Sequence, residues 1–361
     1  MDQFVSLQQV AKAARRNLTK FVWDYLTGGS EAEITLRRNR LALDSLALRP
    51  RILRDVAIID PSTRFLGHKL RIPVMLAPIG SLQIIEPGGA VTAARAAAEF
   101  GTISFMSSVT QPGIKQVGAA TDAPKIFQLY VRGDDGWIDD QVRMAADCGF
   151  NAFCLTVDVA HYSRRERDLL NRWRPSSRQR TVEGRAFQAA LSWDNVKHYK
   201  DTHDLPLIIK GIATEEDAVM ACDHGVEVIY VSNHGGRQLD HGRGAIEVLP
   251  EIAAAVAGRA AIVIDGGFMR GTDVIKAIAL GADAVALGKL QGLALAAGGQ
   301  AGLVRALELL EGEIETSMAL LGLHNFGEID ESYVEPSEPV IAPHVTSPYP
   351  LIDFEELEYD R

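Results

Sequence analysis

Cysteine is scarce in this chain, and negative charge outweighs positive charge. The three cysteines are Cys148, Cys154 and Cys222, an odd number without the spacing of a metal site or a disulfide framework. We therefore expect buried free thiols and a cytoplasmic protein. Lys and Arg total 37 against 47 Asp and Glu, a formal net charge of −10. A nucleic-acid surface needs clustered positive charge, so this balance argues against one.

Long apolar runs are also absent. No segment reaches the roughly 18 uninterrupted apolar residues of a membrane-spanning helix, and the first residues, MDQFVSLQQVAKAARRN, lack the apolar stretch of a secretion signal. We expect a soluble, unexported protein without a membrane partner. With 361 residues, 47% of them hydrophobic, the chain is long enough for one large domain with a substantial core.

Short runs rich in Val, Ile and Leu alternate with helical patterns, which is typical of a parallel sheet covered by helices. The runs do not alternate between polar and apolar residues, as expected for strands buried on both faces. Eight such runs predict an α/β fold, a (β/α)8 TIM barrel. They span residues 72–78, 102–108, 125–131, 152–158, 205–211, 227–234, 260–267 and 284–289.

Three regions lie outside this regular pattern. In the predicted domain of residues 1–330, residues 1–70 form an N-terminal helical extension and residues 159–200 an insertion after the fourth strand. The insertion holds eight arginines between Arg164 and Arg185. It is either a solvated loop or subunit contact, or a gate that draws in an anionic substrate. Residues 331–361 form an acidic, proline-rich tail, expected to be extended and either disordered or laid against a neighbouring subunit.

Polar residues stand at the carboxyl ends of the predicted strands, where barrels of this type form their active sites. After the last two strands, glycines and a lysine supply the backbone N–H groups and the cation that often hold a phosphate there. The sequence therefore implies a phosphorylated cofactor or substrate. The strand-end residues are Ser107, Ser108, Gln128, Tyr130, Thr156, Asp158, Lys210, Ser232, His234, Asp265, Gly266, Gly267, Gly288 and Lys289.

Ten motifs along the chain are WDYLTGG, PRILRDV, APIG, FQLY, LTVD, SRRERD, LPLIIKGI, SNHGGRQLD, DGGFMRGTDV and ALGADAV. From about residue 6 to residue 330 their order and spacing resemble the FMN-dependent L-2-hydroxy acid oxidases and dehydrogenases. That family includes glycolate oxidase, lactate oxidase, mandelate dehydrogenase and lactate 2-monooxygenase. The resemblance implies bound FMN, oxidation of a small-molecule 2-hydroxy acid to the 2-oxo acid, and a homotetramer.

The resemblance also implies roles for individual residues. His234 would be the catalytic base and Asp158 the carboxylate paired with it. Arg165 and Arg237 would clamp the substrate carboxylate, because a guanidinium can grip a carboxylate at two points. The other implied catalytic residues are Tyr25 and Tyr130, which would contact substrate oxygens, and Lys210, which would stabilise negative charge on the reduced flavin. The implied FMN-binding residues are Ala77, Pro78, Ile79, Gly80, Ser107, Gln128, Thr156, Lys210, Ser232, Asp265, Gly266, Gly267, Gly288 and Lys289.

The chain departs from the glycolate oxidase pattern in the phosphate-binding turns. Met269 and Lys289 stand where that pattern has arginines. Methionine supplies no cation, and Arg270 is a candidate to compensate.

The substrate pocket departs too. Val109 replaces a tryptophan and Ile79 a threonine, which favours a bulkier or more apolar substrate side chain. Gly80 stands where many oxidases have alanine, which leaves oxygen or another electron acceptor open.

Other functions remain open on the sequence alone. Oxidative decarboxylation of the lactate monooxygenase type would use the same site. Lys210 could instead form a Schiff base in an aldolase, and a degenerate barrel could bind a ligand without turnover. The spacing of His234, Asp240 and His241 matches no established ligand pattern, so no metal is expected.

Overall fold

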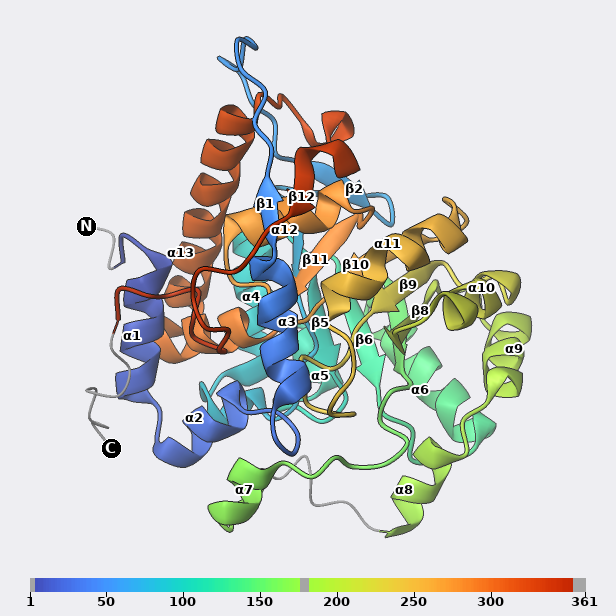
Figure 1. Cartoon of the computed structure of the whole chain (residues 1–361). Helices are drawn as coiled ribbons and strands as arrows, with labels where there is room; N and C mark the ends of the chain where they lie inside the picture. Colours follow the sequence, from blue (N-terminus) through green and yellow to red (C-terminus); the bar gives the residue numbers. More distant parts are fainter. Residues whose placement is uncertain (1–3, 176–181, 353–361) are drawn as a thin grey trace.

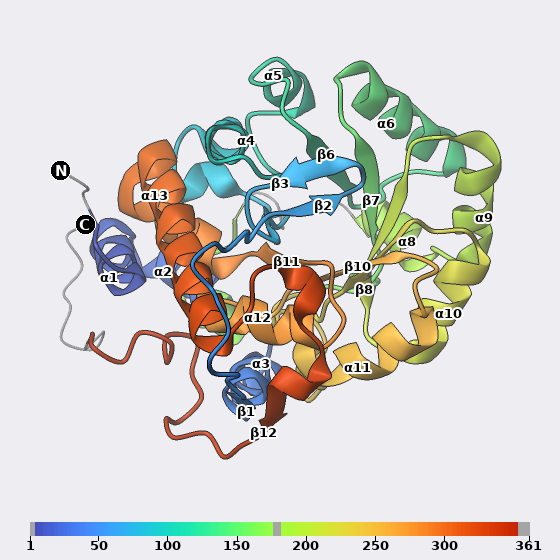
Figure 2. The same ribbon diagram turned by 90° about the horizontal axis from the view of Figure 1, so that it is seen from above.

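The computed structural model describes residues 4–175 and 182–352. Within them, eight parallel strands form a closed barrel surrounded by helices (Figures 1 and 2). The predicted (β/α)8 barrel is confirmed. In barrel order the strands are β4 (Val74–Leu76), β5 (Ser104–Ser107), β6 (Lys125–Leu129), β7 (Ala152–Thr156), β8 (Leu207–Ile212), β9 (Val228–Val231), β10 (Ala261–Ile264) and β11 (Ala284–Leu287), which pairs again with β4.

Helices connect the strands and cover their outer faces. They are α4 (Gly89–Phe100), α5 (Ile114–Gly118), α6 (Asp135–Asp147), α9 (Trp193–Thr202), α10 (Glu215–Asp223), α11 (Ala245–Val256), α12 (Gly271–Ala279) and α13 (Lys289–Leu321). Strand side chains that point outward pack on these helices, and those that point inward fill the barrel. Both faces are therefore buried, which explains why the strands read as continuous apolar runs.

The N-terminal extension is helical only in part. Helices α1 (Leu7–Asn17), α2 (Lys20–Thr27) and α3 (Ile34–Asp44) come first. They are followed by strand β1 (Leu46–Leu48) and a hairpin of β2 (Thr63–Phe65) and β3 (His68–Leu70), none of which was predicted. Phe65 and Leu70 are buried with the barrel interior, so the hairpin closes the end of the barrel from which β4 starts (Figure 2).

The predicted insertion is shorter than residues 159–200. It contains α7 (Glu166–Leu170) and α8 (Val182–Ala189), whereas α9 belongs to the layer of helices around the barrel. Val196 and Tyr199 of α9 are buried, and the Tyr199 ring lies 5.5 Å from that of Phe153 on β7. A helix fixed by such core contacts is not part of a gate. Residues 176–181 of the basic segment lie outside the described residues.

The described part of the tail lies against its own chain. After the short 3-10 helices at Phe326–Glu328 and Glu331–Tyr333, β12 (Val334–Pro336) pairs antiparallel with β1. Further on, Tyr349 is 1% exposed, with its hydroxyl 3.4 Å from the Met269 carbonyl oxygen. Tyr349 and β12 therefore fix the described part of the tail to its own chain, which contradicts disorder there, and contact with a neighbouring subunit stays a prediction. The prediction for residues 353–361 falls outside the described residues.

Helix α13 is long and apolar enough, by length and composition, to cross a membrane. It is nevertheless a core helix here. Its backbone departs from helical geometry at Gly298 and Gly299, and its apolar side packs against α1, α4 and α12 (Figure 1). The candidate segment is 56% buried inside the protein, so its apolar character serves the core of this fold.

Candidate active site

A cavity opens at the carboxyl ends of the barrel strands and encloses about 1090 Å³ with its mouth included. Residues from the N-terminal extension, the insertion and several βα loops line it. Ten of the predicted site residues that line the cavity come from four segments: Ala77, Pro78, Ile79 and Gly80 after β4; Asp265, Gly266 and Gly267 after β10; Gly288 and Lys289 after β11; and Lys210 on β8. The other predicted site residues that line the cavity are Tyr25, Tyr130, Arg165, His234 and Arg237.

His234, just beyond β9, sits between a carboxylate and a phenol. Its Nδ1 lies 3.0 and 3.1 Å from the two Asp158 carboxylate oxygens, and its Nε2 lies 3.2 Å from the Tyr130 hydroxyl. The carboxylate accepts a hydrogen bond from Nδ1–H, which leaves Nε2 as the basic nitrogen of the neutral ring. Burial lowers the pKa of His234 although Asp158 acts to raise it. The neutral form suited to taking up a proton therefore prevails at neutral pH.

The backbone brings Asp158 close enough for this pairing. Strand β8 shifts register against β9 between Lys210 and Ile212, and the intervening Gly211 has φ +119°. A Cβ there would lie 2.7 Å from the Asp158 Cβ, so a side chain would push the carboxylate away. Burial alone would raise the pKa of Asp158, but the adjacent His234 and Lys210 lower it overall. The pair is therefore a carboxylate facing an imidazole.

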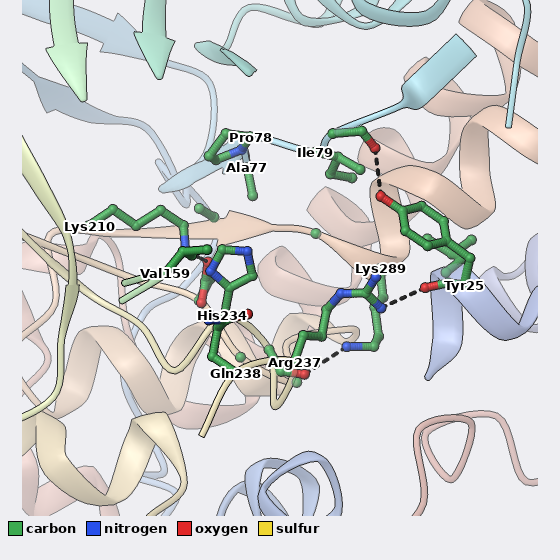
Figure 3. A pocket seen from close by; sticks show the side chains of 18 of the residues that line it. Tyr25, Ala77, Pro78, Ile79, Val159, Lys210, His234, Arg237, Gln238 and Lys289 are labelled. Atoms are coloured by element: carbon green, nitrogen blue, oxygen red, sulfur yellow. Dashed lines mark hydrogen bonds and ion pairs between the residues drawn. The ribbon is translucent and has the colours of Figure 1, made fainter. Parts of the chain in front are cut away.

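The side chain of Arg237 is held in place by hydrogen bonds to the backbone of the N-terminal extension. Its Nη1 donates to the carbonyl oxygens of Tyr25, at 2.6 Å, and Gly28, at 2.8 Å, and the guanidinium lies 5.0 Å from the Tyr25 ring centre. The Tyr25 hydroxyl in turn donates to the Gly80 carbonyl oxygen at 3.0 Å. Figure 3 shows Arg237, Tyr25 and His234 facing one space, and Arg165 lines the same cavity. Two guanidinium groups and an imidazole thus meet as the sequence predicted.

Lys210 forms a buried charged group with two partners. Its Nζ donates to the Ser232 hydroxyl at 2.7 Å and lies 3.2 Å from Asp265. Burial acts to lower the pKa of Lys210, but Asp265 and Asp158 outweigh it, and the pKa is raised. A Schiff-base lysine attacks as a neutral amine, whereas this one is a fixed cation. The arrangement counts against the aldolase alternative.

Three further predicted residues form a buried polar row at adjacent strand ends rather than lining the cavity. Ser107 pairs in register with Gln128, whose Nε2 donates to the Thr156 hydroxyl at 2.8 Å. The Gln128 Oε1 is buried and has no hydrogen-bond partner among the described residues. Buried acceptors are nearly always paired, so this one suits an N–H donor such as a flavin ring carries.

The phosphate end of the cavity keeps a basic side chain, Lys289. Gly288 precedes α13, and a Cβ added to it would meet nothing within 4 Å, so an anion can approach the start of a long helix. The Lys289 Nζ donates to the Gly235 carbonyl oxygen at 2.9 Å, and burial, together with the Arg237 charge, lowers the pKa of Lys289 to about 7. An open helix N-terminus, an adjacent lysine and the Gln128 acceptor all fit FMN.

Arg270 does not replace the missing arginine. Its guanidinium pairs with Glu313 at 2.8 Å and donates to the Pro348 carbonyl oxygen at 3.2 Å, and it does not line the cavity. Met269 does line the cavity but carries no charge. The expected compensation by Arg270 is therefore wrong, because the tail and α13 engage this side chain.

Some lining residues were not predicted. Val159 and Tyr162, early in the insertion, and Gln238 face the cavity. The Gln238 Nε2 donates to the carbonyl oxygens of Asp158 at 2.9 Å and His161 at 3.0 Å, and the second bond ties the insertion to the loop of His234. Their positions in the sequence could have indicated this, because Val159 and Tyr162 follow the LTVD motif closely and Gln238 lies within SNHGGRQLD. Residues so close to a catalytic residue share its loop.

Asp240, weighed as a metal ligand, has a structural contact instead. Its Oδ1 accepts a hydrogen bond from the Thr35 backbone at 2.8 Å, near the start of α3. Within residues 4–175 and 182–352, no group of three or more His, Cys, Asp or Glu is arranged to hold a metal ion.

The fold and the cavity define a class: a barrel enzyme built to hold a phosphorylated flavin beside an anionic substrate. The model of the family described as FMN-dependent dehydrogenase matches residues 14–336. The chain belongs to this family and is an FMN-dependent enzyme that oxidises 2-hydroxy acids.

Curated and solved relatives agree. A peroxisomal (S)-2-hydroxyacid oxidase of Arabidopsis thaliana is 37% identical over 92% of this chain and 97% of its own. A glycolate oxidase of Zea mays is 38% identical over 92% of this chain and 96% of its own. Among solved structures, mandelate oxidase with (S)-2-phenylpropionate superposes with a TM-score of 0.86 at 37% identity, covering 94% of this chain and 100% of that one.

Proposed function

We propose that His234 takes a proton from the substrate while Arg165 and Arg237 hold its carboxylate, and that electrons leave the enzyme to oxygen. Bound FMN would supply the two-electron acceptor. His234 Nε2 is the base, Asp158 favours the imidazolium that forms, and the Tyr130 hydroxyl, 3.2 Å from Nε2, fixes the substrate hydroxyl beside it.

One observation carries this proposal: a neutral imidazole, oriented by a carboxylate, shares a cavity with two guanidinium groups. Asp158, Arg165 and the loop that carries both His234 and Arg237 are separate in sequence, so their convergence is a property of the folded site. A charge-assisted hydrogen bond to the substrate carboxylate is worth about 1.5–3 kcal/mol, and positioned general-base catalysis about 10²–10⁴-fold in rate.

The substrate side chain is proposed to be large and apolar. Ile79, Val109 and Val159 line the cavity with aliphatic groups, and Tyr162 adds an aromatic one. Glycolate would leave this surface without contacts, whereas an aryl or long alkyl group would bury it at about 25 cal/mol per Å². The mandelate oxidase likeness supports an aromatic 2-hydroxy acid.

The test is His234→Gln in the FMN-loaded protein. Glutamine keeps hydrogen-bonding capacity but is no base, so FMN should stay bound while anaerobic flavin reduction slows by at least about 10²-fold. His203→Gln is the matched control, because His203 also pairs with a carboxylate, Asp139 at 2.7 Å, outside the cavity. Equal rates for wild type and His234→Gln would remove the base from the site.

The electron acceptor is read from the products of the wild-type reaction. Peroxide and 2-oxo acid in equal amounts support an oxidase. Release of carbon dioxide with the shortened acid would instead identify oxidative decarboxylation of the lactate monooxygenase type.

Assembly into a homo-oligomer is supported by the segment between β1 and β2, which projects from the barrel in Figure 1. Its Ile52, Leu53 and Ile58 are between 81% and 99% exposed. Exposed apolar clusters of this kind mark protein contacts, and the mass in solution tests the proposal. A cytoplasmic location stays a prediction, since the plant relative described above is named as peroxisomal.

A further inference from the structure

Helix α3 of the N-terminal extension lies against two functional loops at once. One is the catalytic loop, residues 232–244, which carries His234 and Arg237. The other is the phosphate loop, residues 265–270, between β10 and α12, and Asp273 lies just beyond it in the first turn of α12. Two neighbouring side chains of α3 make the connection, Asn39 at 1% exposure and Arg40 at 4%. Neither lines the cavity, and the side-chain hydrogen bonds of both go to protein groups.

Asn39 is joined to the catalytic loop by paired amide groups. Its Nδ2 donates to Asn233 Oδ1 at 2.9 Å, and its Oδ1 accepts from Asn233 Nδ2 at 2.7 Å and from the Ala245 backbone N–H at 2.9 Å. Asn233 immediately precedes His234, which has a left-handed backbone with φ 58°. A non-glycine residue is strained in this region and needs its neighbours held. Asn39 supplies that restraint from another part of the chain.

The buried guanidinium group of Arg40 is hydrogen-bonded to the phosphate loop and to Asp273. Its two terminal nitrogens donate to the Asp273 carboxylate oxygens at 2.8 Å each, and Nη1 also donates to the Gly267 carbonyl oxygen at 3.1 Å. Asp273 Oδ2 accepts from the backbone N–H groups of Met269 and Arg270 at 3.0 Å each. Arg40 and Asp273 therefore fix both ends of the turn from Gly267 to Arg270.

The two loops also leave no room for side chains that would separate them from α3. A Cβ on Gly236 would lie 2.5 Å from the Leu36 Cα, and one on Gly267 would lie 3.2 Å from the Asn39 Cβ. Both glycines have positive φ, 74° and 92°. The same helix backbone thus sets how far each loop stands from the cavity.

We propose that α3 is the common template for the catalytic and phosphate loops, with Asn39 a positioning residue for His234 and Arg40 a positioning residue for FMN binding. Both side chains pack close to the phosphate loop, but their hydrogen bonds to the loops differ: those of Asn39 go to the catalytic loop and the start of α11, and those of Arg40 go to Gly267 and Asp273. The two effects are therefore separable. Loss of Asn39 should act mainly on proton transfer, and loss of Arg40 mainly on cofactor affinity.

Arg40→Leu alone would leave the Asp273 charge buried and unpaired, which threatens folding. The double variant Arg40→Leu/Asp273→Asn removes the cross-link without a buried charge, and the asparagine oxygen can still accept from Met269 and Arg270. Asn39→Ala tests the other arm, and Asn39→Ser, whose uncharged hydroxyl can still donate and accept a hydrogen bond, is the conservative variant. Lys276→Met is the matched control, because Lys276 Nζ donates to the Leu43 carbonyl oxygen at 2.7 Å and joins α12 to α3 without a hydrogen bond to either loop.

The measurements are the FMN dissociation constant by equilibrium flavin titration of the apoprotein, the anaerobic reduction rate at saturating FMN, and the melting temperature. We expect the double variant to raise the FMN dissociation constant at least about 10-fold and to change the reduction rate by a smaller factor. We expect Asn39→Ala to slow reduction by about 10- to 100-fold, as small displacements of catalytic groups do, with a smaller change in FMN affinity and partial recovery in Asn39→Ser.

Lys276→Met should lower the melting temperature without either effect. The proposal is overturned if the two α3 variants change affinity and rate in the same proportion, or if both match Lys276→Met. Either result would make α3 a general support for the fold. Because FMN affinity is measured without turnover, failure of His234 as the base would leave the Arg40 arm intact.

Discussion

Replacing Asp158 by asparagine tests the electrostatics of the catalytic pair. The carboxylate oxygens lie 3.0 and 3.1 Å from His234 Nδ1, and the pair is the main interaction that raises the pKa of His234 against the effect of burial. Loss of one charge-assisted hydrogen bond to the imidazolium costs about 1.5–3 kcal/mol. Each 1.36 kcal/mol added to the activation free energy slows a reaction tenfold, so the rate of flavin reduction should fall about 10- to 150-fold.

The pH dependence of the reaction tests independently whether Asp158 raises the pKa of His234. His234 accepts the proton as the neutral ring, so its pKa sets the acidic limb of kcat/KM. Asp158 raises that pKa, so Asp158→Asn should lower it further and move the acidic limb to lower pH while the plateau falls. The assay is anaerobic flavin reduction by stopped flow across pH. Asp139→Asn is the control, since Asp139 pairs with His198 and His203 outside the cavity.

A limb that moves to higher pH in Asp158→Asn would refute the assignment of Asp158 as the partner that stabilises the imidazolium. An unchanged plateau would do so as well, because a lost charge-assisted bond must appear in the rate.

Two further predictions concern the cofactor and the substrate. The pKa of Lys289 is lowered to about 7, and a bound phosphate would raise it again, so FMN binding is coupled to uptake of a proton above pH 7. The affinity for FMN should therefore weaken above pH 7 by up to about tenfold per pH unit. Lys289→Arg should flatten this dependence in an FMN titration from pH 6 to 9. Val109→Trp should lower kcat/KM for an aromatic 2-hydroxy acid far more than for glycolate, because the indole fills the apolar space beside Ile79; equal losses for both substrates would place Val109 outside the side-chain pocket.

The barrel was predictable because parallel strands buried on both faces must be written as apolar runs. The carboxyl ends of those strands meet at one rim, so the sequence alone suffices to group His234, Asp158 and Lys210. By contrast, β1 and β12 are three residues each, and Leu48 pairs with Val334, far away in the sequence. So short a strand has no periodicity to read, and its pairing depends on tertiary contacts.

Arg270 shows why a positive charge near a binding motif in the sequence does not by itself predict a phosphate ligand. Its neighbour in sequence, Met269, occupies the cavity wall, and adjacent residues on an extended turn point to different sides. Glu313 and the Pro348 carbonyl oxygen hold the guanidinium on the far side. Only knowledge of what packs behind the loop, here α13 and the tail, reveals that the cation is already engaged.

The same reasoning explains why Asn39 and Arg40 are invisible as site residues in the sequence. Their partners Asn233 and Asp273 lie 194 and 233 residues away, and on a helix of an extension they read as ordinary polar positions. The βα loops of this site are tied to one another by side chains such as Lys289 and Gln238, and an element outside the barrel adds a further restraint on the distance between them. In this chain that element is α3, so the extension takes part in positioning both proton transfer and cofactor binding.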